Sequence, residues 1–244
     1  MGKWLARLRY ALRRHGPVGF IWLAGYNLVY YISQRDRNAE RTAQADAFDG
    51  NYGTETSGMR EIGTLDVVSA AAARYAVRYD PSNPEVVRTL ISKLQIDYNR
   101  FSFIDFGSGK GRVLLVSAGF PFKEVIGVEF SRELHEVALK NIARFPRNET
   151  YAGMVRSLND DASAYEPPRS DLICYFYNPF GAPVMERVAT RLAALHERYG
   201  YRVIIIYVDP RHPDIFEKTT KFAILVKSPD VVVLTTDSYP VPEY

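Results

Sequence analysis

The sequence predicts an α/β fold in which a mostly parallel sheet, covered by helices on both faces, ends in an antiparallel hairpin and is preceded by a helical N-terminal extension. Short apolar runs alternate with helical stretches throughout residues 101–208. The runs are apolar along nearly their whole length, which is typical of parallel strands buried on both faces. The last two runs, 222–226 and 231–236, are separated only by a short turn at 228–230, which indicates an antiparallel pair.

Residues 1–33 form a predicted N-terminal helical arm. Its first stretch places apolar residues at helical spacing, with basic residues largely off that stripe: Trp4, Leu5, Leu8, Ala11 and Leu12. The apolar run at 17–32 is interrupted by glycines and is shorter than a bilayer span requires, so we do not expect it to cross a membrane. Two roles stay open for the arm: packing on the main domain, which we favour, or contact of residues 1–32 with a membrane surface.

Residues 34–78 are predicted to be a linker and a helical lid. The chain turns polar after Gln34, and the sequence at 49–53, Asp-Gly-Asn-Tyr-Gly, indicates a loop. A helix is expected over 65–75. Ser82 or Asn83 can then cap a new helix that has Pro84 in its first turn.

The main domain is predicted to span residues 79–244. Its expected strands and helices alternate, and the third connection of the sheet is expected to end at 159–162. The strands are 101–106, 125–130, 172–177, 203–208, 222–226 and 231–236, and the helices are 112–118, 133–143 and 184–196. Because consecutive parallel strands need crossover connections, this alternation indicates one doubly covered sheet.

Composition narrows the class of protein further. The chain has 244 residues, of which 47% are hydrophobic, and it contains one cysteine, Cys174, within an apolar run. This excludes a disulfide framework or a cysteine metal cluster and favours a cytoplasmic protein. The four histidines show no ligand spacing, so no metal site is expected. Residues 1–41 hold eight of the 31 basic residues against two acids, which leaves the rest of the chain slightly acidic and argues against a nucleic-acid partner.

The strongest chemical signal is the glycine-rich run at 103–112, between the first expected strand of the domain and its helix. Glycines let a ligand approach the backbone, and a helix N-terminus offers unpaired N–H groups to a carboxylate or a phosphate. A phosphate-binding loop would need Ser or Thr after Lys110, but Gly111 follows. A dinucleotide fingerprint would need a third glycine at position 112, where Arg112 stands.

Glu129 ends the second expected strand of the domain, 18 residues after Gly111. At the tip of that strand, a carboxylate can accept hydrogen bonds from both hydroxyls of an unphosphorylated ribose. The alternative is a solvated surface acid, which the preceding glycine loop makes the weaker interpretation.

Residues from about 79 to 244 resemble the class I S-adenosylmethionine-dependent methyltransferases, most closely a poorly characterised bacterial family. The resemblance is carried by the run 103–112, by 125–131, and by an Asn-Pro-aromatic motif like that of amino-group methyltransferases: Asn178, Pro179 and Phe180. The stretch 79–82 is also similar to a pre-motif of some non-SET protein-lysine methyltransferases. The likeness implies a Rossmann-like class I methyltransferase fold, with a seven-stranded sheet that ends in a hairpin.

The resemblance also implies roles for single residues. Asp105, Gly107, Ser108 and Gly109 belong to the first motif, in which residues 107–109 shape the methionine pocket. Glu129 holds the ribose, and Asp161 holds the adenine amino group, for which an ordinary turn or helix cap is the alternative. Lys110 is a candidate partner of the methionine carboxylate, against the alternative of a solvated loop lysine.

The acceptor is expected to be an amine of a protein or of a small molecule. Asn178 and a neighbouring carbonyl can accept its two N–H bonds and point its lone pair at the methyl group, so no strong base is needed. Three alternatives stay open: O-methylation with Asp209 or His212 as base, a membrane-associated module that binds the cofactor without turnover, and a nicotinamide oxidoreductase.

Overall fold

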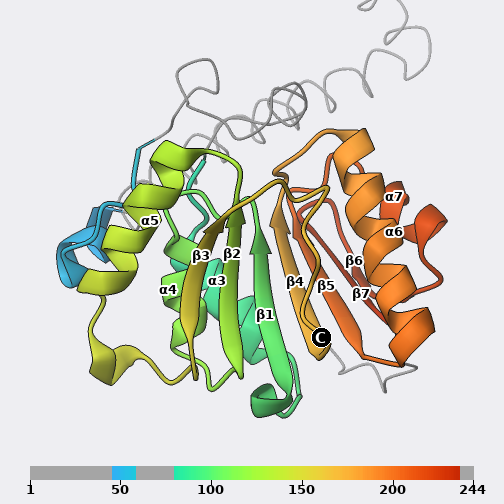
Figure 1. Ribbon diagram of the computed structural model, residues 1–244, viewed down its shortest axis with the longest axis horizontal. Helices are drawn as coiled ribbons and strands as arrows, with labels where there is room; N and C mark the ends of the chain where they lie inside the picture. Colours follow the sequence, from blue (N-terminus) through green and yellow to red (C-terminus); the bar gives the residue numbers. More distant parts are fainter. Residues whose placement is uncertain (1–45, 59–79, 237–244) are drawn as a thin grey trace, which may run out of the picture. The chain divides into compact units, whose positions relative to one another are not determined.

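The computed structural model describes residues 46–58 and 80–236, and within them the chain forms one seven-stranded sheet (Figure 1). The strand order is β3-β2-β1-β4-β5-β7-β6. The first five strands run parallel, whereas β7 pairs antiparallel with both β5 and β6. The predicted parallel sheet with a terminal hairpin is therefore confirmed, and the fold is the Rossmann-like methyltransferase fold.

The strands lie close to their predicted positions: β1 (Phe101–Phe106), β2 (Glu124–Glu129), β3 (Val155–Asn159), β4 (Asp171–Tyr177), β5 (Val203–Val208), β6 (Ala223–Lys227) and β7 (Val231–Thr235). The central strands β1, β4 and β5 are buried along nearly their whole length, and β3 and β6 at the two edges are partly exposed. This burial explains why near-continuous apolar runs marked the central strands in the sequence.

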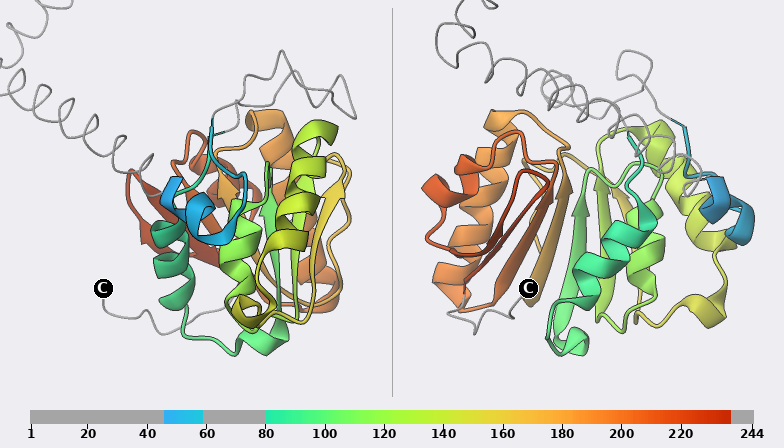
Figure 2. Two further views of the ribbon diagram at one scale, coloured as in Figure 1. Left: turned by 90° about the vertical axis from the view of Figure 1, so that its left-hand side faces the viewer. Right: turned by 180° about the vertical axis from the view of Figure 1, so that it is seen from behind.

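The helices are α3 (Pro84–Ser92), α4 (Arg112–Ala118), α5 (Arg132–Arg144), α6 (Ala182–Tyr199) and α7 (Asp214–Thr219). Figure 2 shows α3 and α4 on one face of the sheet and α6 and α7 on the other. Helix α5 packs against β3 and β2 near one edge. The sheet is thus covered from both sides, as the sequence predicts.

Local signals set where the helices begin and end. Of the two predicted caps for α3, Asn83 is the one used: its side chain accepts from two backbone N–H groups, with Pro84 as the first helical residue. Ser131 caps α5 in the same way. Gly200 ends α6 in the left-handed conformation that glycine adopts without strain.

Two apolar cores lie on the two faces of the sheet. The core under α6 and α7 includes Phe106 and Phe176, whose rings stack with centroids 4.9 Å apart. The core under α3 and α4 includes Phe103 and Ile173. Cys174 in β4 is fully buried and its thiol is free, and burial raises the pKa of that thiol.

The loop predicted at 49–53 is wrong, because residues 46–52 are helical and only Gly53 lies in a turn. The Asp49 carboxylate accepts hydrogen bonds from Thr54, Thr56 and Ser57, so it organises the chain that follows the helix instead of starting a turn.

The short helix α7 was not predicted. The predicted arm at 1–33 and the predicted helix at 65–75 lie outside the described residues. In the described parts of the chain, no helix has the length and apolar content to span a bilayer.

Candidate functional site

A pocket opens at the carboxyl ends of β1, β2 and β4, where the strand order changes direction. Strand β1 pairs with β2 on one side and with β4 on the other, so the strand order reverses at β1. Ligands of open α/β sheets bind at such a switch point, outside the carboxyl ends of the strands. Six residues predicted from three separate motifs line this pocket: Asp105, Gly107, Ser108, Glu129, Pro179 and Phe180. Segments more than 70 residues apart in the sequence therefore meet in one cavity.

The glycine loop, residues 107–111, joins β1 to α4 with a backbone that few residues other than glycine adopt. Gly107, Gly109 and Gly111 have φ values of +82°, +52° and +87°. A Cβ atom on Gly107 would lie 2.5 Å from Cβ of Pro179. The loop therefore lies directly against the Asn-Pro-Phe motif, and both conformation and space require glycine at 107.

Ser108 leaves a polar atom in the pocket wall without a partner. The side chain is 5% exposed, and its Oγ has no hydrogen-bond partner among the described residues. The backbone around it is satisfied, since the N–H groups of Gly107 and Ser108 donate to the carbonyl of Val128 at 2.9 and 3.2 Å. A buried hydroxyl without a partner costs free energy, so this atom fits a ligand that forms hydrogen bonds in the pocket.

Glu129 ties the end of β2 to the glycine loop. Its carboxylate is 2% exposed; Oε2 accepts from the N–H of Gly109 at 2.7 Å, and Oε1 accepts from the N–H of Ser131 at 2.8 Å. A carboxylate offers about four acceptor positions, so it can accept further hydrogen bonds from a ligand. Burial raises the pKa of Glu129 to about 7, although the backbone hydrogen bonds act to lower it.

Asp105 is the second buried carboxyl of the pocket. Burial, followed by repulsion from Glu129, raises the pKa of Asp105 well above its usual value. Two neighbouring carboxyls in a dry site resist ionising together.

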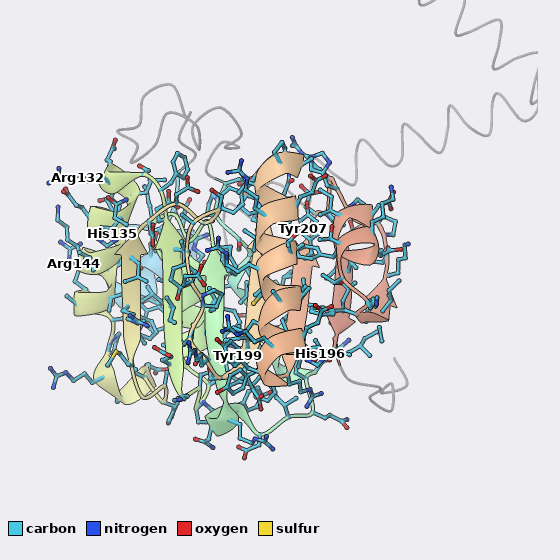
Figure 3. The ribbon with its side chains drawn as sticks, turned by 45° about the vertical axis from the view of Figure 1, so that its right-hand side comes forward. Arg132, His135, Arg144, His196, Tyr199 and Tyr207 are labelled. Atoms are coloured by element: carbon cyan, nitrogen blue, oxygen red, sulfur yellow. The ribbon has the colours of Figure 1, made fainter. Side chains whose placement is uncertain are left out.

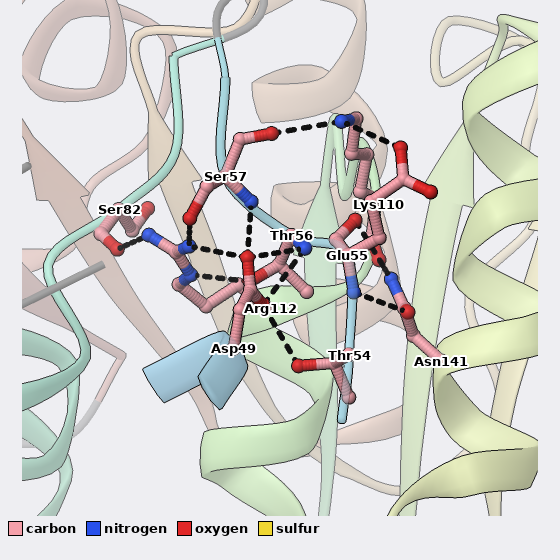
Figure 4. Close-up of polar contacts among 9 residues, drawn as sticks. All are labelled: Asp49, Thr54, Glu55, Thr56, Ser57, Ser82, Lys110, Arg112 and Asn141. Atoms are coloured by element: carbon pink, nitrogen blue, oxygen red, sulfur yellow. Dashed lines mark hydrogen bonds and ion pairs between the residues drawn. The ribbon is translucent and has the colours of Figure 1, made fainter. Parts of the chain in front are cut away.

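Lys110 and Arg112 are both buried against the segment at 46–58. Lys110 is not solvated and does not line the pocket: it is 3% exposed, and its Nζ donates to the carbonyl of Ser57 at 2.8 Å (Figure 4). Arg112, at the start of α4, is 2% exposed, and its Nε donates to Oγ1 of Thr56 at 2.7 Å. Both cations therefore bind the segment at 46–58, which we call the strap.

The Asn-Pro-Phe motif follows β4 at the edge of the pocket. Asn178 has φ +43°, in the left-handed region, and the residue before a proline normally has an extended backbone. Its side chain is 5% exposed, and Oδ1 has no hydrogen-bond partner among the described residues. Asn178 does not itself line the pocket, whereas Tyr177, Pro179 and Phe180 on either side of it do. A strained backbone that carries an unpartnered amide oxygen marks a position with a role beyond packing.

The remaining predicted residues lie outside the pocket lining. The Asp161 carboxylate accepts from the N–H of Ser163 at 2.8 Å, which is the turn contact weighed as its alternative role. It follows the end of β3, whose Asn159 donates to the carbonyl of Glu129 at 2.9 Å. Asp209 follows β5, is exposed, and has φ +47° before a proline, like Asn178. The backbone N–H of His212 donates to the Tyr207 hydroxyl at 3.4 Å.

Sequence reasoning missed several residues that line the pocket. Asp80 and Ser82 come from the segment before α3, and Leu134 comes from α5. For Asp80 and Ser82, the one signal in the sequence was the likeness of 79–82 to a pre-motif of some non-SET protein-lysine methyltransferases. Arg112 carried no signal, because a charged residue at a helix start is ordinarily exposed.

The three described histidines lie in separate places: His135 is in α5 and His196 in α6, apart from each other (Figure 3), and His212 precedes α7. His135 bonds Oγ of Ser157 at 2.8 Å through Nδ1, and His196 bonds the carbonyl of Tyr201 at 2.9 Å. In residues 46–58 and 80–236, no three His, Cys, Asp or Glu side chains are grouped so as to hold a metal ion.

The chain matches no family model and no curated protein. Among solved structures it is similar to a ribosomal protein L11 methylase from Lactobacillus delbrueckii subsp. bulgaricus, with 16% identity over 64% of this chain and 79% of that chain and a TM-score of 0.46. An RNA methyltransferase from Salinibacter ruber, in complex with S-adenosyl-L-homocysteine, has 17% identity over 68% of this chain and 95% of that chain, with a TM-score of 0.41. The glycopeptide N-methyltransferase MtfA, complexed with S-adenosylmethionine, has 10% identity over 64% of this chain and 88% of that chain, with a TM-score of 0.45. By strand order and by the place of its pocket, this chain has the Rossmann-like methyltransferase fold.

Proposed function

We propose that this protein is an S-adenosylmethionine-dependent methyltransferase and that its acceptor is an amine. One observation carries the proposal: one pocket at the switch point of the sheet is lined by residues of three predicted motifs, namely Gly107 and Ser108, the buried Glu129, and Pro179 and Phe180. The pocket residues fit the cofactor, because Oγ of Ser108 is buried without a partner among the described residues and the Glu129 carboxylate can accept more hydrogen bonds than the two from Gly109 and Ser131.

Each part of the cofactor has a residue of suitable chemistry. The loop residues Gly107, Ser108 and Gly109 would surround the methionine portion. Glu129 would accept hydrogen bonds from the ribose hydroxyls with the acceptor positions that Gly109 and Ser131 leave open. One oxygen of Asp161 is taken by Ser163, so its Oδ2 would accept from the adenine amino group. When bound, S-adenosylmethionine supplies a methyl group on a positively charged sulfur.

The acceptor chemistry follows from Asn178. A neutral amine needs two acceptors for its N–H groups, and then its lone pair is free to attack. Oδ1 of Asn178 lacks a partner among the described residues, and a backbone carbonyl of a neighbouring residue would supply the second acceptor. Catalysis would rest on alignment, which can contribute ~7 to 11 kcal/mol, and not on a strong base. This role requires the amide to turn towards the pocket that Tyr177 and Pro179 line.

Calorimetric titration tests the cofactor. We expect S-adenosylmethionine and S-adenosylhomocysteine to bind and NAD not to bind. Glu129→Ala should weaken S-adenosylhomocysteine binding by roughly 10-fold to 150-fold, because hydrogen bonds to a charged group are worth about 1.5 to 3 kcal/mol. Gly109→Val should abolish binding, because a branched side chain at φ +52° distorts the loop. Binding of NAD alone would overturn the proposal.

A labelled-methyl transfer assay on cell lysate, separated into protein, nucleic-acid, lipid and small-molecule fractions, tests the acceptor. We expect label on amines of protein or of small molecules, and none with the Gly109→Val variant. Label only on hydroxyl groups would favour O-methylation. Cofactor binding without transfer to any fraction would favour a binding module.

A further inference from the structure

We propose that the strap, residues 46–58, holds the glycine loop in the conformation that binds the cofactor, with Arg112 as the positioning residue that transmits its effect. This inference rests on the proposed function. It extends the cofactor site to a segment that ends 49 residues before the glycine loop begins.

The Arg112 guanidinium is almost enclosed by strap atoms. Its Nε donates to Oγ1 of Thr56 at 2.7 Å, one Nη donates to Oγ of Ser57 at 2.9 Å, and that nitrogen lies 3.7 Å from Oδ2 of Asp49 (Figure 4). The other Nη donates to the carbonyl of Ser82 at 3.4 Å. Arg112 therefore joins the strap to the segment before α3, and both Arg112 and Ser82 line the cofactor pocket.

The strap itself is built around the Asp49 carboxylate. Thr54 and Thr56 donate their hydroxyls to Oδ1, each at 2.7 Å, and the N–H groups of Thr56 and Ser57 donate at 2.8 and 2.7 Å. Burial raises the pKa of Asp49, but these hydrogen bonds outweigh it, so the pKa lies below its usual value. The carboxylate that pairs with Arg112 thus stays ionised at neutral pH.

A second bridge reaches the backbone of the glycine loop. Asn141 of α5 is fully buried; its Nδ2 donates to the carbonyl of Lys110 at 2.9 Å and to the carbonyl of Glu55 at 3.1 Å. Its Oδ1 accepts from the N–H of Glu55 at 2.8 Å. One amide therefore binds the strap and the loop together, beside the contact of Lys110 with Ser57.

These contacts make the loop conformation depend on the strap. Removing the strap would take from Arg112 its hydrogen bonds to Thr56 and Ser57 and its pairing with Asp49, and breaking such contacts of a buried charge is strongly destabilising. The loop and the start of α4 would then have to shift to bring Arg112 to water. A ligand that binds the present loop conformation must therefore favour the docked strap, and the docked strap must favour the ligand by the same factor.

The test compares Thr56→Val with Thr220→Val in the full chain. Both threonines are buried, at 0% and 4% exposure, and both hydroxyls donate hydrogen bonds, but Thr220 bonds the carbonyl of Phe216 in α7, away from the strap. Calorimetry with S-adenosylhomocysteine should give a dissociation constant about 5-fold to 150-fold higher for Thr56→Val, the usual range of coupling between sites, and an unchanged one for Thr220→Val. Loss of stability alone would affect both variants.

Hydrogen exchange gives a second readout, independent of turnover. Saturating S-adenosylhomocysteine should slow exchange of the amides at 54–57 in the wild type, and less so in Thr56→Val. If Thr56→Val does not fold, Ser57→Ala removes the 2.9 Å contact to Arg112, keeps the contacts of Thr56, and should show the same effects in smaller size. Equal affinities for wild type and strap variants, with no protection at 54–57, would overturn the inference. A wild-type protein that binds no S-adenosylhomocysteine would overturn the proposed function as well.

Discussion

At the scale of single residues, the charge of the proposed cofactor site depends on two buried carboxyls, of which Glu129 is the one with a pKa near neutrality. Its pKa of about 7 in the folded chain lies above the 4.5 of an exposed glutamate. The folded state therefore binds more protons than the unfolded state between these values, and the free energy of unfolding falls as pH rises from about 4.5 to about 7. The loss amounts to roughly 3 kcal/mol at most, since each pKa unit is worth about 1.4 kcal/mol.

Urea unfolding at a series of pH values tests this prediction. The wild type should lose stability between about pH 5 and pH 7, and Glu129→Gln, which cannot ionise, should lose less. Affinity for S-adenosylhomocysteine should rise with pH over the same window, because the ionised carboxylate accepts hydrogen bonds at both oxygens. Parallel pH profiles for wild type and variant would contradict the assignment of this titration to Glu129.

Asn178 and Asp209 form a matched pair for testing the acceptor. Both have a left-handed backbone before a proline, at the ends of the neighbouring strands β4 and β5. Substitution by alanine should cost a similar backbone strain at both positions, so a difference in activity between the two variants reports the loss of the polar side chain. We expect Asn178→Ala to lower turnover sharply with cofactor affinity nearly intact, and Asp209→Ala to retain turnover.

Steady-state kinetics with the acceptor found in lysate, together with calorimetry, would separate the two variants. Asn178→Gly adds a control for strain, because glycine adopts the left-handed backbone freely. The opposite result, with turnover lost by about 10²-fold to 10⁴-fold in Asp209→Ala and retained in Asn178→Ala, would indicate a general base and O-methylation.

At the scale of elements, the glycine loop and the Asn-Pro-Phe motif constrain each other through Gly107. Gly107 and Gly200 both have positive φ, at +82° and +71°, but a Cβ atom on Gly200 would meet nothing within 4 Å. Gly200→Ala should cost about 1 to 2 kcal/mol of backbone strain. Gly107→Ala adds the overlap with Pro179, so it should cost about 1 to 3 kcal/mol more and should also weaken cofactor binding.

Denaturant unfolding of the two glycine variants, followed by cofactor titration of both, tests this difference. Gly200→Ala should bind S-adenosylhomocysteine like the wild type, since it lies at the end of α6. Equal losses of stability in the two variants would show that the contact between Gly107 and Pro179 relaxes without cost.

At the scale of the whole molecule, the sequence predicts what local patterns encode. The buried strands β1 and β5 match their predicted bounds because apolar runs end where the chain leaves the sheet. The glycine loop and Glu129 were found because backbone geometry and strand position confine the residue types there. Both signals lie within about 30 consecutive residues.

The strap could not be predicted, because its structure depends on partners far along the chain. Asp49 before Gly50 is typical of a turn, yet hydrogen bonds within the strap and the buried Arg112 give the segment a helix and a docked position. For Asp80 and Ser82 the sequence offered only the likeness of 79–82 to a pre-motif, and it is the fold that brings them to the pocket. Interactions of this kind override local preference and leave no periodic pattern.

The place of Cys174 has a practical consequence for spectroscopy. It is the one cysteine of the chain, it is fully buried in the central strand β4, and burial raises the pKa of its thiol, so it stays a thiol in neutral buffer. Alkylating dyes and spin labels react with exposed thiolates. A cysteine introduced at an exposed position, such as Asp46→Cys at the start of the strap helix or Glu186→Cys on α6, would therefore take up a single probe in an otherwise wild-type chain.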